Sequence, residues 1–262
     1  MKRMKTMPSQ FQVYANIFAP VALIFLALGM LWVAGELPAM EYDERMLHTV
    51  ATATFLTLLR LFVAYTGALV VAIPLALWAR QSPRAQRILL PIYDIVQSIP
   101  VLVFFPLFIL LFIKTGFVEG AALVIISLSM LWHIVFTLIS GLSIIPRDIL
   151  DVGRVFKASR LDYLSEVLIP ATMPSLVTGS LLAWAAGWNI IVVAEVLHTY
   201  IPGGTSADDL LGVGNLIVQS SAVGDSALFM YSLIAIMGSV TILNFFVWQP
   251  LLLYAEKFKF EG

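Results

Sequence analysis

The sequence predicts an all-α polytopic membrane protein with six transmembrane helices and a polar loop on the cytoplasmic side. Of its 262 residues, 60% are hydrophobic and only 12% are charged, whereas about a quarter of the residues in a soluble domain are charged. A mean hydropathy of +0.96 and apolar runs long enough to cross a bilayer point the same way. The chain has no cysteine, which excludes disulfides, thiolate metal sites and cysteine nucleophiles.

Six apolar segments follow one another along the chain. The first, 17–34, follows a basic tail at 1–16 and lacks a convincing cleavage signal, so we interpret it as a span rather than a signal peptide. Prolines 91, 100 and 106 interrupt the third segment. Segments two to six cover about 47–79, 88–113, 121–145, 174–197 and 228–254. We therefore expect one six-helix membrane domain over 17–254 and a charged tail at 255–262.

The distribution of Lys and Arg predicts the orientation, because basic residues favour the cytoplasmic side of a membrane. Twelve of the fifteen lie in the two tails and in two alternate intervals, 80–87 and 146–170. Arg45 and Lys114 fall in the opposite intervals, and Arg60 lies within a span. Six helices with both termini in the cytoplasm fit this distribution, whereas five spans would place 146–170 outside.

The interval 146–170 is predicted to form two short amphipathic helices joined by a turn. Its apolar residues form two sets at helical spacing that do not share one face, which indicates a bend near 157–159. Ser159 and Asp162 have the spacing of a capping box at the start of the second helix. By its physics alone, this loop either lies solvated on acidic headgroups or docks a soluble partner.

The stretch DVGRVFKASRLDYLSEVLIP, 151–170, resembles the EAA loop of bacterial and archaeal ABC importer permeases. Its acidic residue, small pair, Ala-Ser-Arg and closing aliphatic-x-aliphatic-Pro stand at the family's spacing. In such permeases this loop seats in a groove on the ATP-binding subunit. The resemblance therefore implies an ATPase-coupling set consisting of Asp151, Val152, Gly153, Phe156, Lys157, Ala158, Ser159, Arg160 and Pro170. One residue departs from the pattern, because Lys157 stands where the family has glycine; a left-handed turn there would cost a lysine about 1 kcal/mol or more.

The resemblance extends from about residue 49 to the end of the chain. PIYDIVQSIPVLVFFPLFILLF, 91–112, is similar to the third-helix segment of the subfamily that moves nitrate, sulfonates, taurine and related solutes. The Ala-Glu pair that closes the fifth helix at Glu195, the later Gly212 and Gly214, and NFFVWQPLLLYAEKF near the end are similar too.

This resemblance implies the transmembrane subunit of an ATP-driven importer in the bacterial or archaeal inner membrane, carrying a small solute that is an anion such as nitrate, a sulfonate, taurine or bicarbonate. The sequence has no phosphate-binding Gly-x-x-x-x-Gly-Lys-Ser/Thr loop, so ATP and Mg²⁺ are expected on partner ATPase subunits and no cofactor or metal on this chain. A second permease, identical or related, a periplasmic or lipid-anchored solute-binding protein and the bilayer are the other expected partners, and nucleic acid is not.

Two other classes of membrane protein fit the sequence less well. An ion-driven secondary transporter would usually show internal repeats and a midplane carboxylate; the sequence shows no repeat, and Asp94 lies near the cytoplasmic end of its span. A membrane enzyme would need a cluster of histidines or carboxylates, which the sequence lacks.

Polar residues at membrane depth are candidates for the solute pathway, because they are costly there. Arg60 either faces the pathway as a cation for an anionic solute, or forms a structural pair or snorkels to the surface. His133 belongs to a stripe with Ser129, Thr137 and Gly141 that lines the pathway or packs against another helix. Pro100 breaks the third span and either exposes its backbone to the pathway, with Gln97 and Ser98 nearby, or only kinks the helix for packing.

The outer end of the fifth span supplies the last candidates. Asn189 precedes Glu195, which is expected near the outer surface, where it gates, pairs or, most simply, is solvated. The loop 198–225 contains apolar residues at helical spacing from Leu210 to Ile217. They predict a short amphipathic helix that contacts either a solute-binding protein or lipid. Gly179, Ala183 and Gly187 form a small-residue ridge that is typical of tight helix packing.

Overall fold

The structure is a computed structural model that describes residues 43–146, 148–149, 159 and 162–259. The chain divides into two units, Met1–Asp43 and Glu44–Gly262, and every helix given below belongs to the second. The predicted first span, 17–34, lies outside the described residues.

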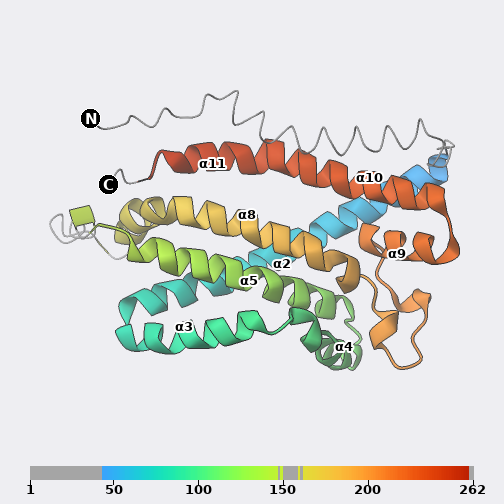
Figure 1. The fold of residues 1–262 in the computed structure, drawn as a ribbon, viewed down its shortest axis with the longest axis horizontal. Helices are drawn as coiled ribbons and strands as arrows, with labels where there is room; N and C mark the ends of the chain where they lie inside the picture. The colour runs from blue at the N-terminus through green and yellow to red at the C-terminus, as the bar shows by residue number, and fades with distance from the viewer. Residues whose placement is uncertain (1–42, 147, 150–158, 160–161, 260–262) are drawn as a thin grey trace. The chain divides into compact units, whose positions relative to one another are not determined.

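The described chain is built from helices, as predicted (Figure 1). Short 3-10 turns and two π-helices separate or extend the longer α-helices. In chain order the elements are α2 (Glu44–Gln81), α3 (Pro83–Ser98), η1 (Val101–Phe104), α4 (Phe105–Ile113), α5 (Glu119–Ser143), η2 (Tyr163–Leu168), α8 (Ile169–Ala194), η3 (His198–Tyr200), η4 (Ser206–Asp208), α9 (Val213–Val223), α10 (Ser226–Leu243), η5 (Asn244–Trp248) and α11 (Gln249–Glu256).

Among the described residues, four helical segments are long and apolar enough to cross a membrane: Glu44–Arg80, Glu119–Ser143, Tyr163–Ala194 and Ser226–Glu256. A fifth candidate is a bent pair, Arg84–Val96 and Val101–Ile113. The described chain therefore holds up to five of the six predicted spans, in the predicted order. Large apolar side chains such as Phe55, Phe62 and Val70 are exposed along α2, as expected for a surface whose solvent is lipid.

The third predicted span is interrupted at Pro100, where its two parts are bent by 87°. The helix α3 ends at Ser98, and Ile99 is extended with φ −85° and ψ 123°. A residue before proline is pushed out of the α region by the proline ring, which explains why the helix ends there. Pro106 causes no break because it occupies the first turn of α4, where its missing N–H is not needed.

The helix α5 packs against both α2 and α8, and this trio holds most of the buried apolar residues. Two glycines permit the α5–α8 approach: a Cβ at Gly179 would lie 1.9 Å from Thr137 Oγ1, and one at Gly141 would lie 2.0 Å from Ser175 Oγ. A Cβ at Gly187 would lie 2.2 Å from Met130 Cε. The predicted small-residue ridge is thus a packing surface, and so are the last two residues of the α5 stripe, Thr137 and Gly141.

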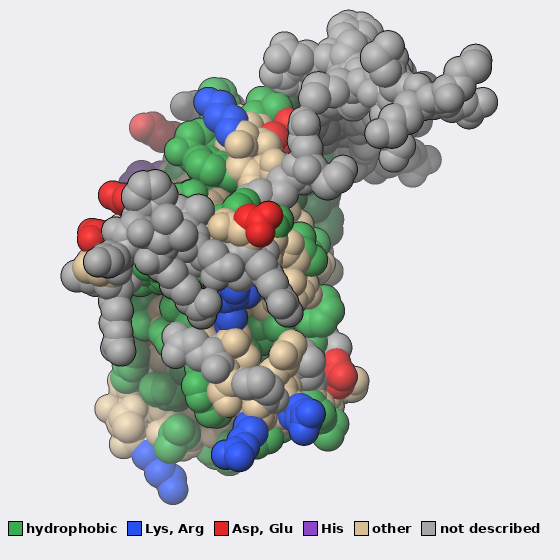
Figure 2. Space-filling view, turned by 90° about the vertical axis from the view of Figure 1, so that its left-hand side faces the viewer, with side chains coloured by type: hydrophobic (Ala, Val, Ile, Leu, Met, Phe, Trp, Pro, Cys, Tyr) green, Lys and Arg blue, Asp and Glu red, His purple; other side chains and the backbone are tan. Residues whose placement is uncertain are grey.

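Lys and Arg side chains lie at one end of the second unit, where α3 begins and α11 ends, and Asp and Glu side chains lie among them (Figure 2). We call it the basic end; its described cations are Arg80, Arg84, Arg87, Lys257 and Lys259. The end of α5 and the start of η2 lie at this end, and α9 lies at the other (Figure 1). We call the other end the α9 end.

Candidate functional site

A cavity of about 600 Å³ lies between the bend of the third span, α5 and α8. It contains three of the predicted pathway residues, Pro100, His133 and Asn189, together with Ser129. The aromatic wall was not predicted: Tyr93, Phe104 and Trp132 also line it. Its remaining lining is apolar, consisting of Val96, Ile99, Val101, Leu128, Leu182, Ala185, Ala186 and Ile190.

The polar side chains of this cavity are partly satisfied by their own helices. Nδ1 of His133 lies 3.0 Å from the Ser129 carbonyl, and Nδ2 of Asn189 donates to the Ala185 carbonyl at 2.9 Å. Within the described residues this leaves Nε2 of His133 and Oδ1 of Asn189 to bond with something else. Among the described lining residues, His133 is also the one whose side chain could carry a positive charge. The cavity is therefore an aromatic and apolar chamber with a few polar contacts, a usual composition for a small-molecule site.

Of the two other predicted residues of the third span, Ser98 is not among the described residues that line the cavity. Ser98 is exposed at the end of α3, and its hydroxyl donates to the Asp94 carbonyl at 2.6 Å. Gln97 belongs to the last turn of α3.

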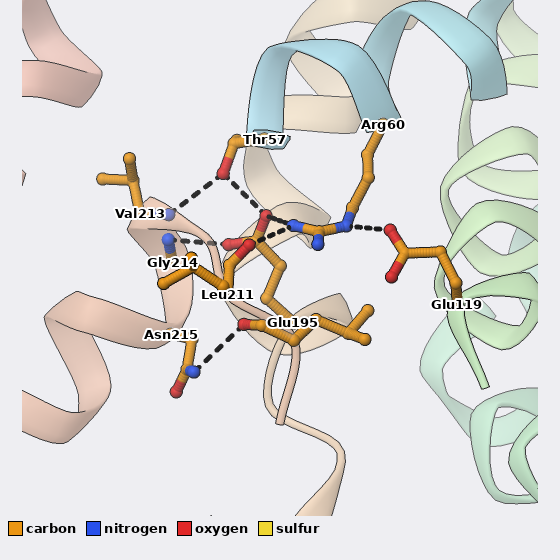
Figure 3. Close-up of polar contacts among 9 residues, drawn as sticks. Thr57, Arg60, Glu119, Glu195, Leu211, Val213, Gly214 and Asn215 are labelled. Atoms are coloured by element: carbon orange, nitrogen blue, oxygen red, sulfur yellow. Dashed lines mark hydrogen bonds and ion pairs between the residues drawn. The ribbon is translucent and has the colours of Figure 1, made fainter. Parts of the chain in front are cut away.

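Arg60 lies in a different place, in a buried network of charges at the α9 end (Figure 3). Its side chain is 6% exposed and forms ion pairs with Glu119, at the start of α5, and with Glu195. Nη1 donates to Glu195 Oε1 at 2.7 Å and to the Leu211 carbonyl at 2.9 Å. Of the alternatives given for Arg60, the structure shows an ion pair with other side chains of the protein.

Glu195 is fully buried, so the expectation of a solvated carboxylate is wrong. Oε1 accepts from the Thr57 hydroxyl at 2.7 Å, and Oε2 accepts from the Gly214 N–H at 2.8 Å. The Thr57 oxygen accepts in turn from the Val213 N–H at 3.0 Å. The carboxylate and hydroxyl thereby cap the first turn of α9, where free N–H groups and the helix dipole favour a negative charge.

Gly212 and Gly214 are needed by this carboxylate. A Cβ at Gly212 would lie 2.2 Å from Glu195 Cδ, and one at Gly214 would lie 2.9 Å from Oε2. Gly212 has φ −171°, an extended conformation open to any residue, so the requirement is one of space. We call Thr57, Arg60, Glu119, Glu195 and the start of α9 the clasp, because it joins α2, α5 and α8 to α9.

Thr57 and Glu119 were not anticipated as members of this network with Arg60 and Glu195. Thr57 precedes Arg60 by three residues on α2, and residues at that spacing share a helix face. This signal was available in the sequence. The contact between Glu195 and the start of α9 could not be predicted in this way, because only the fold places Gly214 against Glu195.

The predicted ATPase-coupling stretch, 151–170, is described only in part. Asp151 to Ala158 and Arg160 lie outside the described residues, including Lys157 at the family's glycine position. The predicted capping box is confirmed: the Asp162 N–H donates to Ser159 Oγ at 3.2 Å, and the Ser159 N–H donates to Asp162 Oδ2 at 3.3 Å. Pro170 lies in the first turn of α8.

The described chain is thus all-helical, with a chamber between its apolar helices and a capping box at Ser159 and Asp162. Residues 68–252 match the family of binding-protein-dependent transport system inner membrane components, and the chain belongs to that family. This confirms the resemblance on which the sequence-based function rests.

Individual relatives agree with this assignment. The chain is 34% identical over 141 residues to the nitrate import permease protein NrtB of Leptolyngbya laminosa, covering 54% of this chain and 50% of that protein. It is 27% identical over 227 residues to the glycine betaine/proline betaine permease protein ProW of Escherichia coli K12, covering 85% of this chain and 62% of that one. The chain thus spans about half to three fifths of the length of these relatives.

The fold is also found in a solved structure. A chain of the MetNI methionine ABC transporter, in inward-facing conformations, superposes with a TM-score of 0.64 and 17% identity. The match covers 84% of this chain and 100% of that chain. The likeness is one of fold.

Proposed function

We propose that this chain is the transmembrane subunit of an ATP-driven importer, forming the pathway for a small solute and driven by a separate ATPase. Family membership over residues 68–252 carries the proposal. The members matched by name are permease proteins of transport systems, and the sequence of this chain contains no phosphate-binding loop of its own.

The basic end faces the cytoplasm in this proposal, and both termini lie on that side. Support comes from the cations collected there, because Lys and Arg are retained on the cytoplasmic face of a membrane. The predicted coupling set from Asp151 to Pro170 then meets the ATPase, which binds ATP and Mg²⁺. A solute-binding protein approaches the α9 end, and a second permease, identical or related, completes the assembly in the inner membrane.

The chamber around His133 is the proposed solute contact of this subunit. An anion is the better fit, because no carboxylate is found among the described residues of the chamber lining and His133 can donate a hydrogen bond. Arg60 is a poorer contact for the solute, since Glu195 and Glu119 already pair with it. We assign Arg60 and Glu195 to holding the α9 end and not to binding solute.

The first test is uptake in cells that express this chain with its candidate ATPase and solute-binding protein. Uptake of labelled nitrate, taurine, bicarbonate or glycine betaine should require all three components and should stop with vanadate. Uptake that persists without the ATPase would contradict the proposal and favour an ion-driven transporter.

The second test separates the chamber from the rest of the chain. His133→Ala should reduce uptake severalfold while the amount of assembled complex stays constant, and His133→Gln should restore part of it, because Gln keeps a donor and an acceptor. His48→Ala is the matched control, since His48 is exposed on α2 and does not line the chamber. Equal uptake by His133→Ala and His48→Ala would remove His133 from the pathway.

A further inference from the structure

Two π-helices interrupt the described transmembrane helices, and a proline stands two residues after the end of each. In η2 the Ile169 N–H donates to the Leu164 carbonyl, five residues back, and Pro170 comes next. In η5 the Gln249 N–H donates to the Asn244 carbonyl, again five residues back, and Pro250 comes next. The two breaks therefore share one local pattern.

The prolines give a physical cause for both breaks. A proline has no N–H, and its ring clashes with the carbonyl four residues earlier, which belongs to Glu166 for Pro170 and to Phe246 for Pro250. A π-turn places one extra residue in the turn and moves that carbonyl aside. The pattern is specific to these positions, because Pro74 and Pro174 lie inside continuous α-helices.

Each π-turn fixes how one segment is rotated. One extra residue turns the chain on the far side by about 100° and shifts it by about 1.5 Å relative to an unbroken α-helix. At η2 the affected segment is the end of the 144–162 connection, with its capping box at Ser159 and Asp162. At η5 it is α11 and the tail that contains Lys257 and Lys259.

The residues at the η2 break meet the segment beyond the η5 break. A cavity of about 330 Å³ at the basic end is lined by Ile149 of the α5–α8 connection, by Glu166, Val167 and Pro170 at the η2 break, and by the tail from Lys257 to Lys259. The helix α11 also packs against α8. Trp248, the last residue of η5, is 7% exposed and stacks edge-on at 6.0 Å against Trp184 of α8. Both breaks thus adjoin the same helix: η2 leads into α8, and η5 contacts α8 through Trp248.

We infer that Pro170 and Pro250 are paired positioning residues: each holds a π-turn that aims one segment, the coupling stretch or the C-terminal tail, so that the two meet at the basic end. The functional half of this inference rests on the proposed coupling to an ATPase. Its structural half does not, and the two are tested separately.

The structural test is a cysteine scan, which the absence of native cysteine makes free of background. Single cysteines at 162–166 are labelled with a membrane-impermeant maleimide in the otherwise native chain and in Pro170→Ala. Asp162 and Ser165 are exposed, whereas Tyr163 and Leu164 are half-buried. Loss of the extra residue should turn position 163 toward the place that 162 occupies and position 165 toward that of 164. Labelling at 163 should become severalfold faster, and labelling at 165 severalfold slower.

Pro174→Ala is the matched control, because Pro174 lies in the same helix without a π-turn, and its labelling pattern should not change. Pro250→Ala should alter labelling at 257 and 258 and leave 162–166 unchanged, which gives a second reading if Pro170→Ala does not insert. Identical patterns in Pro170→Ala and the parent chain, or no change at 257 and 258 in Pro250→Ala, would overturn the inference.

The functional test is the ratio of solute taken up to ATP hydrolysed in the assembled complex. Pro170→Ala should lower this ratio severalfold, while Pro174→Ala should not. A labelling shift with an unchanged ratio would overturn the functional half. A native chain that never assembles with an ATPase would instead refute the proposed function, and the cysteine scan would still decide the role of the prolines.

Discussion

Replacing Glu195 with alanine should loosen the α9 end more than any other single change in the clasp. The substitution removes the carboxylate that accepts from Thr57, Arg60 and Gly214. Arg60 remains 6% exposed with only Glu119, whose side chain is 35% exposed, as an ion-pair partner. Removing one partner of a buried ion pair costs about 3–5 kcal/mol, chiefly because the other charge stays buried.

Hydrogen exchange of the loop 198–225 measures this cost directly. Amides that exchange through local opening lose protection in proportion to the lost free energy, and tenfold corresponds to 1.36 kcal/mol, so protection at Val213 and Gly214 should fall roughly 150- to 5,000-fold. The purified chain in lipid nanodiscs is suitable, with exchange followed by mass spectrometry of peptides from this loop.

Two variants control the interpretation. Glu119→Gln removes a half-exposed partner and should reduce protection by about tenfold or less, as for other exposed pairs. Replacing both Arg60 and Glu195 with methionine removes the two charges together and should recover much of the loss, because buried ion pairs can be exchanged for apolar residues at little cost. Native-like protection in Glu195→Ala would refute the claim that this carboxylate holds α9.

Three further changes test other parts of the fold. Gly179→Ala should destabilise the α5–α8 contact by about 1–3 kcal/mol, seen as a lower melting temperature; an additional Thr137→Ala should restore it, because the clashing hydroxyl is gone, and an absence of rescue would contradict the packing. Ser159→Ala should weaken the cap by about 0.5–2 kcal/mol and speed amide exchange at Asp162 and Tyr163, whereas an unchanged rate there would show that the box is dispensable. Gly212→Ala should displace the Glu195 carboxylate and mimic Glu195→Ala in exchange, and normal exchange would argue against the close approach.

The positions of the spans follow from the sequence because apolar runs of this length must be helical in lipid, where every backbone group needs an internal partner. This is why 47–79 predicted α2 and 121–145 predicted α5 within a few residues. The break at Pro100 was predictable for an equally local reason, the exclusion of the preceding residue from the α region. The capping box at Ser159 depends on residues only three apart, so it too was readable.

The starting residue of α9 and the contacts of the clasp could not be predicted from local sequence patterns. Helical spacing from Leu210 predicted a helix near its observed place, yet α9 begins at Val213, because Glu195 and Thr57 cap it there. The chamber likewise brings together Pro100 from the bend of the third span, His133 of α5 and Asn189 of α8. Composition selected these polar residues, and packing of α5 on α8 decided which of them share a cavity.

The sequence by itself determined that the chain is an all-α protein with helices long and apolar enough to cross a membrane, because helix class and span length depend on hydropathy counted along the chain. Its family was also legible from one spaced motif. Only the tertiary structure showed that Arg60 and Glu195 pair with each other, since the two residues lie 135 positions apart in the chain. A charged residue at membrane depth needs a partner, but the sequence does not show whether that partner is a solute or a second side chain. The folded structure does.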